Sequence, residues 1–100
     1  MVTYVDAATA PLKNTGAIRL YGAEAFEGLR RAGRFAADCL DAVTELARPG
    51  VTTEEIDAFV YQYAVDRGAL PATLNYRGYT KSVCTSINHV VCHGIPNDKP

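Results

Sequence analysis

Residues 23–48 read AEAFEGLRRAGRFAADCLDAVTELAR, and this stretch decides the fold class. Its apolar residues recur at alternating spacings of three and four, which is the period of an amphipathic helix. We predict one helix over 23–48, with Glu24 in its first turn, Arg48 in its last turn and Pro49-Gly50 as its stop. Its apolar face is expected to contain Phe26, Leu29, Gly33, Ala36, Leu40, Val43 and Ala47.

A second helix is predicted to begin at Thr52. The spacing of Thr52 and Glu55 is that of a capping box, in which each residue bonds the backbone N–H of the other. Gly68 is placed to follow the last turn, and Pro71 blocks continuation. The face of this helix is expected to contain Ile56, Phe59, Val60, Tyr63 and Ala64.

Residues 82–93, SVCTSINHVVCH, are rich in Val, Ile, Thr and Cys, and predict a strand that ends in a turn at 94–98. Residues 1–22 show no sustained period, and we expect an irregular arm without a helix there. Two amphipathic helices and a strong strand together predict an α/β (α+β) protein whose helices cover a sheet.

Composition excludes several classes of function. The 100 residues are 48% hydrophobic and 21% charged, as in a globular domain, and the net charge of -1 includes no basic cluster for nucleic acid. No apolar run is long enough to span a bilayer, so we expect a cytosolic protein. The three cysteines have no C-x-x-C spacing, and we expect reduced thiols, with Cys84 and Cys92 buried.

Two histidines lie four residues apart, at His89 and His93. On a strand this spacing separates them by about 13 Å, which is too far for a shared zinc ion. His89 is expected to be exposed. His93 closes the strand, and the residues leave open whether it serves a site or bonds a loop carbonyl. Cys92 should face away from His93, because neighbouring strand residues point to opposite sides.

Tyr76 and Tyr79 lie on the loop before the predicted strand, where aromatic side chains form either a ligand wall or a lid over a core. No two carboxylates have the spacing of an acid/base or metal-binding pair, and Asp98 stands alone near the end of the strand. From the residues alone, the sequence indicates an α/β module with a candidate site near His93.

Three segments then point to a family: LNYRGY at 74–79, KSVCTSIN at 81–88 and VVCHGIP at 90–96. In order and spacing they resemble the amino-terminal signature of the bacterial type I methionine aminopeptidases. The resemblance extends back through RPGVTT at 48–53 and covers about residues 16–100. It implies an amino-terminal arm at 1–15, and over 16–100 the first half of a pita-bread fold, truncated, with two helices on an antiparallel sheet.

The resemblance also implies an activity, namely removal of the initiator methionine from nascent polypeptides whose second residue is small. The family uses one or two divalent metals (Co, Mn, Fe or Zn), held by two Asp, one His and two Glu, to activate the attacking water. None of these five ligands matches a position in this chain, which is therefore expected to be an inactive fragment. The implied partner is a nascent amino terminus at the ribosome, and the complete enzyme is expected to be a cytoplasmic monomer.

The site residues that the resemblance implies all bind substrate. His93 matches the histidine that hydrogen-bonds the substrate near the scissile amide. The positions that line the methionine side-chain pocket correspond to Thr73, Tyr76, Tyr79 and Cys84. An alternative from another class is a non-catalytic pita-bread relative that keeps the pocket as a peptide-binding or interaction module.

Overall fold

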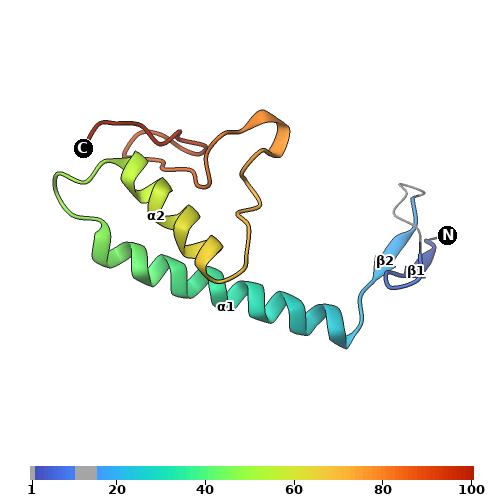
Figure 1. The fold of residues 1–100 in the computed structure, drawn as a ribbon. Coiled ribbons are helices and arrows are strands. Elements are labelled where there is room, and N and C mark those ends of the chain that lie inside the picture. The colour runs from blue at the N-terminus through green and yellow to red at the C-terminus, as the bar shows by residue number, and fades with distance from the viewer. Residues whose placement is uncertain (1, 11–15) are drawn as a thin grey trace. The chain divides into compact units, whose positions relative to one another are not determined.

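The computed structural model describes residues 2–10 and 16–100 (Figure 1). The chain divides into two compact units, Met1–Ala37 and Asp38–Pro100, and the division falls inside helix α1. The described residues form strands β1 (Tyr4–Asp6) and β2 (Ile18–Leu20), helices α1 (Ala23–Leu46) and α2 (Thr53–Asp66), and the short 3₁₀ turn η1 (Tyr76–Gly78). None of these helices is long and apolar enough to cross a membrane. The predicted boundary of the amino-terminal arm, after residue 15, falls at the end of residues 11–15, which lie outside the described residues.

The sheet of the first unit is parallel, so the prediction of an antiparallel sheet is wrong. Strands β1 and β2 pair with Tyr4 opposite Ile18 and Asp6 opposite Leu20. The expected antiparallel ladder required residues 82–93 to be a strand. That segment contains no strand, and the observed pair comes from residues 4–20, where no strand was expected.

Helix α1 confirms the predicted helix but ends two residues before Arg48, which does not lie in the last turn as predicted. The side chain of Arg48 still serves the helix end, because its Nε donates to the carbonyl of Glu45 at 3.0 Å. The predicted apolar face is largely uncovered: Phe26, Leu29 and Leu40 are 53%, 67% and 69% exposed. A helical period fixes which residues share a face, but burial also needs another element to cover that face.

Helix α2 confirms its predicted start and stop. The Thr52 hydroxyl accepts from Glu55 N at 3.1 Å, and the Glu55 carboxylate accepts from Thr52 N at 3.0 Å, which completes the capping box. At the other end, Gly68 adopts a φ of +73°. Its N–H bonds the Val65 carbonyl, and the N–H of Ala69 bonds the Ala64 carbonyl, as in a Schellman motif. The predicted face is half-buried, and Ala64 is only 2% exposed.

Residues 82–96 form a hairpin-shaped loop, hereafter the hairpin loop, and not the single strand that we predicted. The chain reverses at Asn88, whose φ is +54°, and Val90 N bonds the carbonyl of Ile87 at 3.1 Å. Across the loop, Thr85 N donates to Gly94 O at 2.7 Å. An asparagine inside a β-rich run was the signal for this turn, because Asn tolerates a positive φ.

The end of the hairpin loop is tied back to the start of α2, and the return of this segment can be followed in Figure 1. Asn97 N donates to the Thr53 hydroxyl at 2.8 Å, and Asn97 O accepts from Glu54 N at 2.9 Å. Thr53 is buried, with 6% of its surface exposed. These bonds use a donor of the first turn of α2 that has no partner within the helix.

All three cysteines are free thiols, as expected. Cys84 and Cys92 are exposed, so the expectation that they are buried is wrong. The expectation assumed a strand inside a covered sheet, whereas the hairpin loop is open to solvent. Cys39 of α1 is buried, and this burial raises the pKa of its thiol, against a smaller lowering by the positive charge of Arg67.

Candidate ligand pocket

The second unit contains a pocket of about 370 Å³ between residues 75–79, hereafter the aromatic loop, and the hairpin loop. Its lining consists of Thr73, Tyr76, Tyr79, Cys84, His93 and Ile95. The structure therefore brings together all five residues for which the family resemblance implies substrate binding. They are spread over residues 73 to 93 of the sequence. Their role in binding a substrate stays a prediction.

The hairpin loop explains why Cys84, His93 and Ile95 line the same pocket. The bond between Thr85 and Gly94 places these two residues opposite each other, and in an antiparallel arrangement their neighbours alternate between the two faces. Cys84 and Ile95 then share one face, and His93 joins them. Cys92 does not line the pocket, and the prediction that it faces away from His93 assumed a strand that this segment does not form.

His93 has an uncommon backbone conformation, with a φ of +55°. Such strain persists only where the surroundings impose it, and it is frequent at functional sites. Here the Thr85–Gly94 bond adjoins the strained residue. In the part of the chain that the structure describes, no hydrogen bond holds the imidazole, so the alternative of a histidine bonded to a loop carbonyl finds no support.

The aromatic loop is a tight turn that presents two tyrosine rings to the pocket. Asn75 and Arg77 adopt φ values of 64° and 49°, and Asn75 N donates to Tyr79 O at 2.6 Å. The guanidinium of Arg77 lies 5.4 Å from the centre of the Tyr76 ring, which is within the range of a cation–π contact. Both rings line the pocket, and their role as a ligand wall stays a prediction.

Three polar side chains of the lining direct their hydrogen-bond donors toward the protein. The Thr73 hydroxyl donates to the carbonyl of Ser82, and the Tyr79 hydroxyl donates to the carbonyl of Val83 at 2.7 Å. The Cys84 thiol in turn donates to the Tyr79 hydroxyl at 3.7 Å. Each of these side chains has therefore already used its proton donor, and the pocket offers a mainly apolar surface.

Tyr79 is the pocket side chain whose pKa is clearly shifted. Its pKa is raised from 10.0 to about 12, first because partial burial disfavours the phenolate, and then because of its hydrogen bond with Cys84 and the nearby charge of Asp57. The hydroxyl therefore stays protonated over the physiological pH range and keeps its bond to Val83.

Two residues of this region were missed by sequence reasoning. Ile95 follows His93 by two positions, and this spacing was a signal that both lie on one face. Asp57 does not line the pocket but bonds Ser82 and Val83 beside it. It lies on the same side of α2 as Val60 and Ala64, and a carboxylate on an apolar face was the signal for a buried partner.

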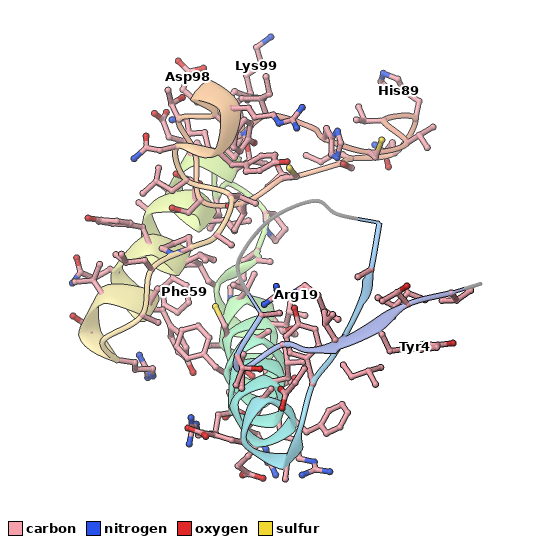
Figure 2. All side chains as sticks on the ribbon, turned by 90° about the vertical axis from the view of Figure 1, so that its right-hand side faces the viewer. Tyr4, Arg19, Phe59, His89, Asp98 and Lys99 are labelled. Atoms are coloured by element: carbon pink, nitrogen blue, oxygen red, sulfur yellow. The ribbon has the colours of Figure 1, made fainter. Side chains whose placement is uncertain are left out.

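The remaining candidates lie outside the pocket. His89 is exposed, as predicted, and Figure 2 shows it at the outer end of the hairpin loop. Asp98 is exposed near the carboxyl end of the chain. Over residues 2–10 and 16–100, no three His, Cys, Asp or Glu side chains gather as metal ligands, so the described residues do not fit a metal centre.

Comparison with known proteins matches residues 27–100 to the model of metallopeptidase family M24. The chain is 48% identical over 83 residues to a methionine aminopeptidase of Rickettsia prowazekii, covering 83% of this chain and 32% of that protein. It is 51% identical over 83 residues to the mitochondrial methionine aminopeptidase 1D of Dictyostelium discoideum, covering 83% of this chain and 20% of that protein.

The fold agrees with these matches. The crystal structure of the Rickettsia prowazekii methionine aminopeptidase superposes with a TM-score of 0.80 and 48% identity, over 82% of this chain and 33% of that one. The chain thus spans only a fifth to a third of the length of these relatives. On this similarity in sequence and structure, the chain belongs to metallopeptidase family M24 and is a homologue of the methionine aminopeptidases.

Proposed function

We propose that this chain supplies the methionine-binding part of a metal-dependent methionyl aminopeptidase. The complete enzyme would remove the initiator methionine from nascent polypeptides whose second residue is small. The observation that supports this proposal is the pocket of about 370 Å³, in which two tyrosine rings, a thiol and a histidine converge. Cavities of this size are typical of small-ligand sites.

The chemistry of the lining suits a thioether. Methionine is unbranched and polarisable, and its sulfur makes favourable contacts with aromatic rings such as those of Tyr76 and Tyr79. Because Thr73 and Tyr79 donate their hydroxyl protons to the backbone, a polar side chain would find few partners there. The pocket therefore favours an apolar, flexible side chain of the length of methionine.

His93 would act on the peptide group next to that side chain. Its imidazole lines the pocket and is not held by the described residues, so it is available to hydrogen-bond the amide of a bound substrate. A donor placed at the scissile amide orients the bond and stabilises charge that develops there.

Membership of metallopeptidase family M24 implies a divalent metal in the complete enzyme, which would supply the activation of the attacking water. The described residues do not gather a ligand set, and we assign no metal-dependent step to them. The proposal is that this chemistry belongs to the two thirds or more of its relatives' length that the chain does not span. The proposal also includes a cytosolic monomer that meets its substrate at the ribosome.

The test is hydrolysis of a Met-Ala-Ser peptide in the presence of Co²⁺ or Mn²⁺. Two proteins are compared, the 100-residue chain and a chimera in which the chain replaces the matched third of the Rickettsia enzyme. We expect activity in the chimera and none in the chain alone. Activity of the chain alone would mean that His89, His93 and Asp98 have to be reconsidered as metal ligands.

An inactive chimera that still binds a methionine amide would favour the alternative function, a peptide-binding module without catalysis. Binding is measured through the pocket thiol. A ligand in the pocket should slow alkylation of Cys84 by N-ethylmaleimide and leave Cys92 unaffected, since both thiols are exposed and only Cys84 lines the pocket. Absence of both activity and protection would reject the proposal.

A further inference from the structure

The pocket is framed by a short backbone segment, Ser82–Val83, whose four polar groups are all held by side chains. The N–H groups of Ser82 and Val83 donate to the same oxygen, Asp57 Oδ1, at 2.6 and 3.1 Å. The Ser82 carbonyl accepts from the Thr73 hydroxyl, and the Val83 carbonyl accepts from the Tyr79 hydroxyl. Side chains therefore replace the neighbouring strand that would normally satisfy these groups.

This segment connects Asp57 to the pocket. Thr73 and Tyr79, which hold its carbonyls, both line the pocket, and the next residue, Cys84, lines it too. Asp57 itself does not line the pocket and comes from α2. The hydrogen bonds of Asp57 therefore reach the pocket through the backbone of Ser82 and Val83.

The two hydrogen bonds that Asp57 Oδ1 accepts are charge-assisted. Hydrogen bonds to a carboxylate are shorter and stronger than those between neutral groups, and Ser82 is buried, with 7% of its surface exposed. Loss of the carboxylate would leave two backbone donors without a partner beside the pocket, and the segment would have to move to satisfy them. Movement of Ser82–Val83 would displace the acceptors of Thr73 and Tyr79 together.

We propose that Asp57 is a positioning residue of the pocket: its carboxylate holds the Ser82–Val83 peptide groups and thereby fixes Thr73, Tyr79 and Cys84 around the methionine side chain. This inference rests on the proposed function, since it takes the pocket to bind methionine. It assigns to an acidic residue of α2 a role in substrate recognition without contact to substrate or metal.

The experiment uses the full chain and its own thiols. N-ethylmaleimide labelling of Cys84 and Cys92 is followed by mass spectrometry of peptides, with and without L-methioninamide, and Cys39 reports on the fold because it is buried. At a ligand concentration of about four times Kd, we expect labelling of Cys84 in the wild-type chain to slow about fivefold, and labelling of Cys92 to stay unchanged.

Three variants are compared. Asp57→Ala should lose the protection of Cys84, whereas Asp57→Asn should keep it, because the amide oxygen can accept from the same two N–H groups. Glu54→Ala is the matched control. Glu54 is also an acidic residue of α2 beside this segment, but it contacts the Lys81 ammonium at 3.5 Å and not a backbone N–H. Protection in this variant should equal that of the wild type.

The outcomes separate the inference from the proposed function. If methioninamide does not protect Cys84 in the wild-type chain, the proposed function fails. If wild type and Asp57→Ala are protected equally, the pocket stands and the positioning role of Asp57 is overturned. If Cys39 becomes reactive in Asp57→Ala, that variant has lost its fold and Asp57→Asn decides. Full protection of Cys84 in Asp57→Asn supports the role of the acceptor oxygen. Loss of Cys84 protection while Cys39 stays unreactive overturns that role.

Discussion

Gly94 and Thr85 approach so closely that a Cβ atom on Gly94 would lie 2.1 Å from the carbonyl oxygen of Thr85. The two residues face each other across the hairpin loop, joined by the Thr85 N–H to Gly94 carbonyl bond of 2.7 Å. The neighbours of this pair, Cys84 and His93, both line the pocket. The shape of the pocket therefore depends on a glycine that contributes no side chain to it.

Gly94→Ala should destabilise the chain by about 2 kcal/mol, because the added methyl group overlaps backbone atoms that cannot rotate away. Urea unfolding measures the change. Gly33→Ala is the control: nothing lies within 4 Å of its Cβ position in α1, and alanine there should stabilise by about 0.5–1 kcal/mol. Equal effects of the two substitutions would show that the close approach has no energetic consequence.

Thr52→Ala should lower the free energy of unfolding by about 1 kcal/mol, since it removes the hydroxyl that accepts from Glu55 N at the start of α2. Thr44→Ala is matched to it. The Thr44 hydroxyl donates to the Leu40 carbonyl inside α1, and that carbonyl already accepts a backbone hydrogen bond of the helix. Loss of the hydroxyl should therefore change the free energy of unfolding by less than about 0.5 kcal/mol. A neutral Thr52→Ala would contradict the capping box.

Stability should fall as the pH rises from 10 to about 12. The pKa of Tyr79 is about 12 in the folded chain against an ordinary 10.0, so over this range the unfolded chain loses the Tyr79 proton while the folded chain keeps it. Below pH 10 both states hold the proton and this contribution is constant. The Tyr79→Phe variant should not show this loss of stability between pH 10 and about 12. Ultraviolet titration of tyrosinate in both proteins isolates the Tyr79 transition, and a midpoint near 10 would contradict the assignment.

The pocket should distinguish methionine from its sulfoxide. L-methioninamide and L-norleucinamide should both protect Cys84, whereas methionine sulfoxide amide should bind about 30-fold more weakly. Thr73 and Tyr79 donate to the backbone, and His93 is proposed to act at the peptide group, so the sulfoxide oxygen would be buried without a donor at a cost of about 2 kcal/mol. Equal protection by sulfoxide and thioether would mean that these hydroxyls rotate toward the ligand.

His93→Ala in the active chimera should lower kcat/KM for Met-Ala-Ser by about 100-fold or more, as expected for loss of a donor at the reacting amide. His89→Ala is the control, because His89 is exposed at the outer end of the hairpin loop (Figure 2). Methioninamide protection of Cys84 in His93→Ala checks that the pocket is intact. Unchanged kcat/KM would remove His93 from the proposed site.

Part of this structure could be predicted from local sequence because the forces that cause it are local. The capping box at Thr52 and the glycine stop at Gly68 each satisfy backbone groups within a few residues, and both are observed. The five pocket residues were named through a family resemblance and not through geometry. Their spacing alone left His93 and the tyrosines undecided.

The sequence by itself therefore determined where the two helices lie, how α2 is capped, and which family the chain belongs to. The tertiary structure decided the rest. It turned the expected strand into the hairpin loop at Asn88, paired β1 with β2 in parallel, and left Leu40 of α1 exposed. It also brought Asp57 to Ser82 across 25 residues of sequence. Pairing and burial depend on which distant groups satisfy a backbone segment, and a local pattern does not contain that information.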